Sequence, residues 1–229
     1  MAKESPTRKV LRIGHRGACG HAPENTLASI EKAIALQCTL TEVDVRRTAD
    51  GSLILLHDER VDRTTNGKGV AADMNLADIR RLDAGRGQNI PTLEETLKTA
   101  HGRIGLMLEL KAEGLAYDVC GIVRASGFPG EIIYASFLHD ELQHVRRADP
   151  GANTLVLFKP LPRNPAAEAA RLQATHVGLR FDSATKPIVT ALHTAHLALF
   201  VYTANKPADI ARMRSLGVDG IVSDYPDRI

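Results

Sequence analysis

Short aliphatic and β-branched runs alternate with longer helical patterns along almost all of this 229-residue chain. Eight runs have the length and composition of buried strands. They cover residues 10–13, 40–45, 104–110, 132–135, 154–158, 175–179, 197–202 and 220–222. The helical patterns between them cover residues 26–36, 92–100, 115–126, 139–148, 166–173, 186–194 and 207–216. Repeated strand-then-helix order implies a parallel sheet, and eight such units close naturally into a TIM (β/α)8 barrel.

One interval, residues 58–90, interrupts this alternation. It is rich in Asp, Arg, Asn and Gly, contains a turn cluster at residues 64–69, and has one short helical pattern at residues 74–82. We therefore expect a small insertion over the strand ends. Because α/β barrels reach this size as one unit, we expect a single domain over residues 1–229.

The charge of the chain argues against extended polyanionic partners. Its 29 basic and 27 acidic residues give a formal net charge of +2, without a run of like charges. The whole-chain field therefore predicts neither nucleic-acid binding nor binding to a membrane surface. No apolar run approaches the roughly 18 to 20 residues of a membrane span, so we expect no stable membrane anchoring. The oligomeric state is left open.

The cysteines and the N-terminal residues predict a cytoplasmic protein. Cys19, Cys38 and Cys120 are odd in number and far apart, which disfavours a disulfide framework or a structural zinc site. We expect three buried thiols in a reducing compartment. Residues 1–9 are polar and mixed in charge, unlike the apolar stretch of a signal peptide.

Two carboxylates, Glu42 and Asp44, lie two residues apart in the strand predicted at residues 40–45. Period-two alternation places both side chains on one face, where they repel each other unless a cation lies between them. An exposed edge strand would explain the pair alone. Glu109, however, ends the strand predicted at residues 104–110 and should reach the same rim of the barrel. Three carboxylates from two strands form a hard oxygen site, suited to Mg²⁺ or Ca²⁺.

Two histidines follow short apolar runs: His15 follows residues 10–13 and His57 follows residues 53–56. Both imidazoles should emerge where a buried strand ends, which is where barrel enzymes place catalytic groups. Imidazole titrates near neutral pH, so one ring can accept a proton while the other donates one. With the carboxylate cluster nearby, this pattern favours a phosphodiesterase site.

These residues belong to a longer series of motifs by which the chain resembles the metal-dependent, barrel-type glycerophosphodiester phosphodiesterases. The motifs are His15-Arg16-Gly17, Glu24-Asn25-Thr26, Glu42-Val43-Asp44-Val45, Thr48-Ala49-Asp50-Gly51, His57-Asp58, Pro91-Thr92-Leu93-Glu94-Glu95, Glu109-Leu110-Lys111, Val201-Tyr202-Thr203-Ala204-Asn205 and Gly217-Val218-Asp219-Gly220-Ile221-Val222-Ser223-Asp224-Tyr225-Pro226. Their shared order and spacing make a chance match improbable.

The resemblance implies hydrolysis of a small-molecule glycerophosphodiester to glycerol 3-phosphate and an alcohol. It implies one divalent cation, Mg²⁺ or Ca²⁺ with Mn²⁺ as an alternative, and proton transfer by the two histidines. It also implies a small cap over the pocket at the insertion, and the short insertion here predicts a fairly open site. The residues expected to contact substrate are Arg16, Asn25, Lys111, Phe137 and Tyr202. Tyr202 stands where the family usually has tryptophan.

Several alternatives stay open at this point. The roles of general acid and general base are not assigned between His15 and His57, and water or a substrate hydroxyl could be the nucleophile. Acylated lipids, as in a lysophospholipase D, are an alternative substrate class. A barrel aldolase with Lys111 as Schiff-base amine and a catalytically inert binding module are the two other function classes.

Overall fold

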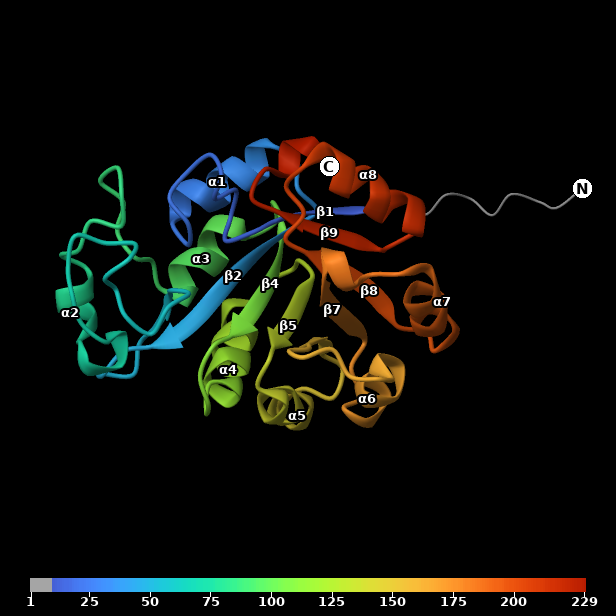
Figure 1. The fold of residues 1–229 in the computed structure, drawn as a ribbon. Coiled ribbons are helices and arrows are strands. Elements are labelled where there is room, and N and C mark those ends of the chain that lie inside the picture. The colour runs from blue at the N-terminus through green and yellow to red at the C-terminus, as the bar shows by residue number, and fades with distance from the viewer. Residues whose placement is uncertain (1–9) are drawn as a thin grey trace, which may run out of the picture.

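Eight parallel strands form a closed barrel in the computed structural model, which describes residues 10–229 (Figure 1). The strands are β1 (Leu11–Gly14), β2 (Leu40–Arg47), β4 (Gly105–Leu110), β5 (Ile132–Ser136), β6 (Asn153–Leu157), β7 (His176–Arg180), β8 (Ala198–Tyr202) and β9 (Gly220–Ser223). Strand β1 pairs with both β2 and β9, placing Ile13 beside Leu40 on one side and Val222 on the other. The predicted TIM barrel is thus confirmed, with small differences at the strand ends.

An α-helix comes after each barrel strand except β9, which is followed by the 3₁₀ turn Pro226–Arg228, and the helices surround the barrel (Figure 1). They are α1 (Leu27–Ala35), α3 (Leu93–Ala100), α4 (Ala116–Ser126), α5 (His139–Ala148), α6 (Pro165–Arg171), α7 (Lys186–Thr194) and α8 (Pro207–Leu216). The cap of α1 shows why the chain turns helical there. The Thr26 hydroxyl accepts a hydrogen bond from the Ser29 amide, and the Ser29 side chain accepts one from the Thr26 amide.

The core divides into an outer shell between sheet and helices and an inner cluster enclosed by the strands. The inner cluster contains apolar side chains from every barrel strand except β7. Its buried members are Ile13, Leu40, Met107, Ile133, Ala135, Leu155, Leu157, Phe200 and Val222. These side chains fill the interior of the barrel. Those nearest the carboxyl ends of the strands form an apolar floor beneath the rim.

The insertion forms a side lobe, defined here as residues 56–91, beside the barrel at the left of Figure 1. A short strand, β3 (Leu53–Leu55), runs antiparallel to β2 and leads into it. The lobe contains the 3₁₀ turn Ala71–Asp73 and the helix α2 (Leu76–Ile79), a shorter helix than residues 74–82 predict. It packs with β3 around its own apolar cluster, of which Val61 and Ile79 are fully buried. His57 therefore enters the site from the base of this lobe.

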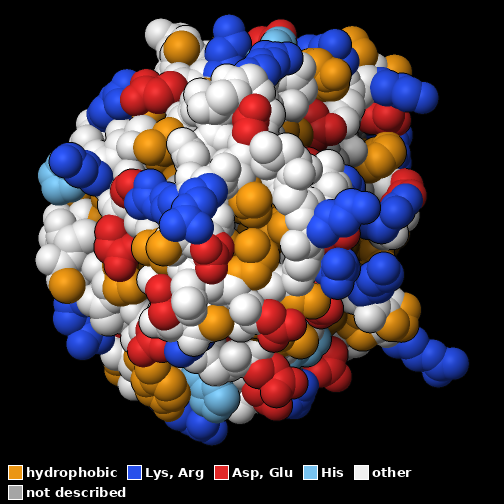
Figure 2. Space-filling view, turned by 90° about the vertical axis from the view of Figure 1, so that its left-hand side faces the viewer, with side chains coloured by type: hydrophobic (Ala, Val, Ile, Leu, Met, Phe, Trp, Pro, Cys, Tyr) orange, Lys and Arg blue, Asp and Glu red, His pale blue; other side chains and the backbone are white. Residues whose placement is uncertain are grey.

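Two surface observations bear on partners. Basic and acidic side chains are interspersed over the face in Figure 2, which carries the side lobe. Among residues 10–229, no helix combines the length and the apolar character needed to cross a bilayer. The polar segment 1–9, on which part of the localisation prediction rests, lies outside the described residues.

Candidate active site

The predicted metal ligands and histidines meet at the carboxyl ends of the barrel strands. His15 follows β1, Glu42 and Asp44 belong to β2, and Glu109 lies near the end of β4. Asp44 is in register with Glu109 on the neighbouring strand. This rim is where the active sites of the fold are found. An inner pocket reaches from His15, Glu42 and Glu109 down to the apolar floor.

Glu42, Asp44 and Glu109 form a carboxylate cluster. One oxygen from each lies within 4.8 Å of the others, and both β2 carboxylates are buried. Burial and the neighbouring charge of Asp44 raise the pKa of Glu42 to about 8, and the same two causes raise the pKa of Glu109. Glu42 Oε1 and Asp44 Oδ1 are buried without a hydrogen-bond partner among the described residues. Unsatisfied, mutually repelling hard oxygens are what a divalent cation would neutralise, so the donor set fits the predicted metal.

Asn25 is bonded to one of the predicted metal ligands. Its side chain is buried, its Nδ2 donates to Asp44 Oδ2 at 2.8 Å, and its Oδ1 accepts from the Asp44 amide at 3.1 Å. Both polar atoms of the amide are therefore engaged by Asp44. Asn25 lines neither pocket at this rim, and its side chain orients Asp44, so its contact with substrate stays a prediction.

Two cations border the carboxylate cluster and face the outer pocket of the rim. Lys111 Nζ lies 2.7 Å from Glu109 and 3.5 Å from Asp44. Arg16 Nε lies 3.4 Å from Asp44, and its Nη1 donates to Glu24 at 2.8 Å. Burial lowers the pKa of Lys111, but the two carboxylates outweigh burial and raise it, so the ammonium stays charged. Both residues thus present positive charge to the outer pocket of the rim, and their contact with substrate stays a prediction.

His15 is held by an aspartate from the opposite end of the chain. His15 Nδ1 lies 2.6 Å from Asp224 Oδ1, and His15 Nε2 lies 3.9 Å from Glu42. Burial lowers the pKa of His15, but the hydrogen bond to Asp224 and the charge of Glu42 outweigh burial and raise it. Asn205 Nδ2 donates to Asp224 Oδ2 at 2.6 Å and fixes the carboxylate in turn. This chain of bonds leaves Nε2 of His15 directed toward the site.

His57 has a similar partner within the side lobe. His57 Nδ1 lies 2.6 Å from Asp58 Oδ1, and Arg63 Nε donates to Asp58 Oδ2 at 2.6 Å. Both terminal nitrogens of Arg63 also donate to Glu24, each at 2.8 Å. Burial lowers the pKa of His57, although the carboxylates of Asp44 and Asp58 favour the charged ring. The side lobe therefore holds His57 through an ionic network of Asp58, Arg63 and Glu24. Glu24 belongs to the loop after β1.

Phe137 and Tyr202 form the aromatic wall of the site. Their ring centroids lie 6.3 Å apart with the planes nearly perpendicular, and both rings line the inner and the outer pocket. Phe137 is one of two large apolar side chains that stay exposed among the described residues. Both aromatic rings therefore lie at the pockets of the rim, and their contact with substrate stays a prediction.

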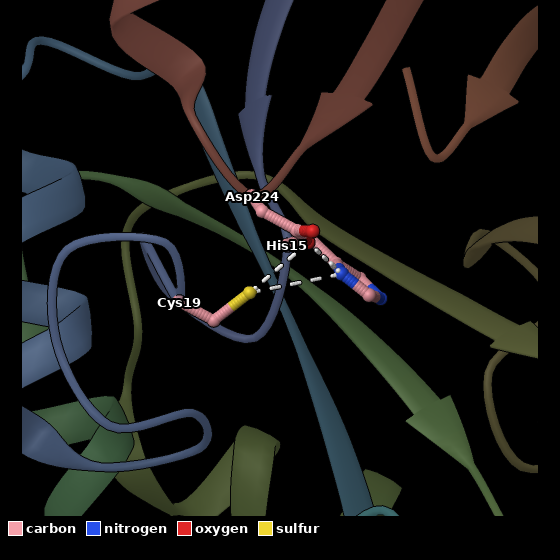
Figure 3. Close-up of side chains that lie close together, drawn as sticks. All are labelled: His15, Cys19 and Asp224. Carbon is pink, nitrogen blue, oxygen red and sulfur yellow. Dashed lines mark hydrogen bonds and ion pairs between the residues drawn. The ribbon is translucent and has the colours of Figure 1, made fainter. Parts of the chain in front are cut away.

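The prediction that all three cysteines are buried thiols is wrong for Cys19. Cys38 and Cys120 are buried, but Cys19 is half-buried and points at His15 and Asp224 (Figure 3). Its thiol donates to Asp224 Oδ1 at 3.0 Å. Burial and the same carboxylate raise the pKa of this thiol.

Sequence reasoning assigned no role to Asp224, Asn205, Asp58 or Arg63. The first three belong to the motifs quoted above, so their position in those motifs is the signal that could have marked them. Arg63 lies in the insertion and had no such signal. Only the fold brings its guanidinium between Asp58 and Glu24.

Comparison with known proteins gives consistent matches over nearly the full chain. Residues 15–228 match the glycerophosphoryl diester phosphodiesterase family. The Bacillus subtilis protein YhdW is 37% identical over 232 residues, 95% of each chain. A glycerophosphodiester phosphodiesterase of Caldanaerobacter subterraneus is 32% identical over 234 residues, 96% of each chain. A phosphodiesterase of Oleispira antarctica, solved with the product sn-glycerol-3-phosphate, superimposes with a TM-score of 0.88 at 27% identity, covering 95% of this chain and 94% of its own.

Proposed function

The chain belongs to the glycerophosphoryl diester phosphodiesterase family, and on that premise we propose that it hydrolyses small glycerophosphodiesters to glycerol 3-phosphate and an alcohol. The observation that carries the proposal is one rim of the barrel that holds both a carboxylate cluster with unsatisfied oxygens and two aspartate-held histidines. A phosphodiester is a poor electrophile with a poor leaving group. It needs positive charge at its oxygens and a proton at the departing alkoxide.

The metal part of the proposal rests on the donor set. Glu42, Asp44 and Glu109 would hold one Mg²⁺ or Ca²⁺, with Mn²⁺ as an alternative. The bound ion would withdraw charge from the phosphoryl oxygens. Asn25 keeps Asp44 oriented toward the ion, as partners of metal ligands commonly do.

The chain's own cations and imidazoles supply the remaining chemistry. Arg16 and Lys111 would bind the non-bridging phosphate oxygens from the outer pocket. His15 and His57 would transfer protons through Nε2, because the Nδ1 of each ring is occupied by its aspartate. The same groups serve direct attack by water and attack by a neighbouring substrate hydroxyl.

The aldolase alternative is disfavoured by the surroundings of Lys111. A Schiff-base lysine must be neutral to attack a carbonyl, yet Lys111 lies beside two carboxylates that raise its pKa. An inert binding module would have no need for two histidines that each carry an orienting aspartate. Both observations favour a hydrolase.

We expect a small soluble diester, such as glycerophosphocholine or glycerophosphoethanolamine, in preference to an acylated lipid. The short side lobe and the near-neutral chain support this choice. The Oleispira relative binds sn-glycerol-3-phosphate as product, which matches the glycerol side of such a substrate. Nucleic acid is not expected as a partner, and the cytoplasmic location stays a prediction from the unpaired cysteines.

A substrate panel after metal exchange tests the proposal. The enzyme is stripped with EDTA, reloaded with Mg²⁺, Ca²⁺ or Mn²⁺, and assayed on glycerophosphocholine, glycerophosphoethanolamine, lysophosphatidylcholine and bis(p-nitrophenyl) phosphate. Turnover should disappear on chelation, return with a hard cation, and be fastest on the deacylated diesters. Full activity without metal would contradict the cation site. A strong preference for lysophosphatidylcholine would contradict the substrate class alone.

A further inference from the structure

His15, Cys19 and Asp224 form a second group of metal-ligating atoms, separate from the carboxylate cluster (Figure 3). The group offers one nitrogen, one sulfur and one oxygen. Nδ1 of His15 and Sγ of Cys19 lie 2.6 and 3.0 Å from Asp224 Oδ1, and 3.9 Å from each other. A tetrahedral zinc ion, with bonds of about 2.0 to 2.3 Å, keeps such donors about 3.3 to 3.6 Å apart. Two of the three separations are shorter than this range and the third is longer.

The backbone holds these three donors together in a way that suits a metal site. His15 and Cys19 lie on one turn after β1, and the His15 amide donates to Ser223 at 3.0 Å. The Gly20 amide donates to the Asp224 carbonyl at 2.9 Å. Asn205 occupies the other oxygen of Asp224 and leaves Oδ1 for the shared position. Small side-chain movements therefore suffice to admit an ion.

We propose that His15, Cys19 and Asp224 bind Zn²⁺ and that zinc bound there inhibits the enzyme. A thiolate and an imidazole select zinc over the hard cations that three carboxylates prefer. The fourth position can be filled by water, since the side chains of His15 and Asp224 are 20% and 28% exposed. On binding, the thiol proton of Cys19 leaves to solvent, and the Nδ1 proton of His15 leaves to solvent or moves to Nε2, so that the ring binds as a neutral imidazole. The ion takes the place of the two hydrogen bonds to Asp224 Oδ1.

Inhibition follows from the position of His15 between two sites. Its Nδ1 faces Cys19 and Asp224, whereas its Nε2 faces Glu42. Zinc bound to Nδ1 would prevent the His15 imidazole from transferring a proton in the proposed reaction. The proposal goes beyond the proposed function, because no step of that reaction needs Cys19 or a second ion.

Zinc titration of the full-length enzyme with saturating Mg²⁺ tests the inference. We expect inhibition of wild type, and in Cys19→Ser a rise in the inhibitory zinc concentration of about tenfold or more, each variant being normalised to its own zinc-free rate. Cys38→Ala is the matched control, since it removes a thiol that is buried elsewhere. It should be inhibited as wild type is. Equal inhibition of wild type and Cys19→Ser, or no inhibition of either, would overturn the proposal.

A spectroscopic arm keeps the test independent of turnover. Co²⁺ added to the Mg²⁺-saturated protein should give a thiolate-to-cobalt charge-transfer band in wild type and Cys38→Ala, and none in Cys19→Ser. If Cys19→Ser does not fold, persistence of the band in both Cys38→Ala and Cys120→Ala assigns it to Cys19. Absence of the band in wild type overturns the proposal. Inactivity on glycerophosphodiesters would instead count against the proposed function and leave the zinc site standing.

Discussion

His15 and His57 each direct Nδ1 at an aspartate 2.6 Å away, but the two aspartates belong to very different parts of the molecule. Asp224 follows barrel strand β9 and is fixed by Asn205 and by the backbone around it. Asp58 belongs to the side lobe and is fixed by Arg63, whose side chain is 48% exposed. One histidine is thus built into the frame of the barrel. The other depends on a surface ionic network between lobe and barrel.

The two histidine–aspartate pairs have the same local geometry, but they should differ in how well they withstand mutation and salt. Hydrogen bonds inside a rigid frame keep their geometry, whereas exposed ion pairs contribute little stability and are screened by salt. Changes at the His57 side should therefore give smaller and more salt-dependent effects than the matching changes at the His15 side. Substitutions, salt and pH should reveal this difference.

Removing either imidazole should abolish most turnover. His15→Ala and His57→Ala should each lower kcat by roughly 10²- to 10⁴-fold, the usual contribution of a general acid or base, with Mg²⁺ affinity nearly unchanged. A p-nitrophenyl diester needs little protonation of its leaving group, so it should rescue only the variant that lacks the general acid. Steady-state kinetics and magnesium titration measure both effects. Loss of metal binding in both variants, or rescue of neither, would refute these roles.

Removing the orienting carboxylates should separate the two pairs. Asp224→Asn should lower kcat on the order of 10²-fold and Asp58→Asn on the order of 10-fold, because the His57–Asp58 pair is more exposed to water than the His15–Asp224 pair and so orients its ring less strongly. Asp58 favours the charged form of His57, so its loss should lower the pKa of that ring still further. The limb of the pH–rate profile that belongs to His57 should then move to lower pH. A larger loss in Asp58→Asn than in Asp224→Asn would reverse the comparison.

Breaking the network at Arg63 should act mainly on His57. Arg63→Ala removes the donors to Asp58 and Glu24, and we expect kcat/KM to fall about tenfold, partly restored in Arg63→Lys. Arg60→Ala is the matched control, because Arg60 lies in the same loop and, among residues 10–229, its side chain forms an ion pair only with Asp62. It should behave as wild type. If 0.5 M salt leaves the rate of wild type unchanged and Arg63→Ala is fully active, the network has no positioning role.

The smallest expected effect is on stability at low pH. Arg63 lowers the pKa of Asp58, and it lowers the pKa of Glu24 although burial opposes this. A depressed folded-state pKa gives stability that is complete above the unfolded value, near pH 4, and is lost as the pH falls through the folded value. Thermal melts from pH 6 to pH 2.5 should therefore show a shallower loss of Tm in Arg63→Ala than in wild type. Parallel curves would contradict this linkage.

Patterns of residues close in sequence predicted much of the fold and part of the site. Strand-and-helix alternation gave the barrel, and the two-residue spacing of Glu42 and Asp44 placed both carboxylates inside it, because strand geometry is local. The position of Glu109 beside Glu42 and Asp44 followed from the rule that parallel strands end at one rim. These inferences needed no knowledge of loop conformation.

Loop conformation decided what the sequence could not predict. The turn after β1 has positive φ at Arg16 and Gly17, and a Cβ on Gly17 would lie 2.1 Å from the Ser29 hydroxyl of α1. That close approach, which depends on tertiary packing, directs Cys19 back toward His15. The same dependence on packing explains why the bonding of Asn25 to Asp44 was not foreseen.

The closure of β1 against β9 has a consequence for how the protein is made. His15 and Asp224 are separated by 209 residues in the chain and meet only when the last strand joins the first. A growing polypeptide on the ribosome carries His15 and the carboxylates of β2 early, yet lacks the partner of His15 until β9 and Asp224 have been synthesised. Catalytic competence is thus acquired only when β9 closes the barrel, and a chain that terminates before Asp224 should be idle.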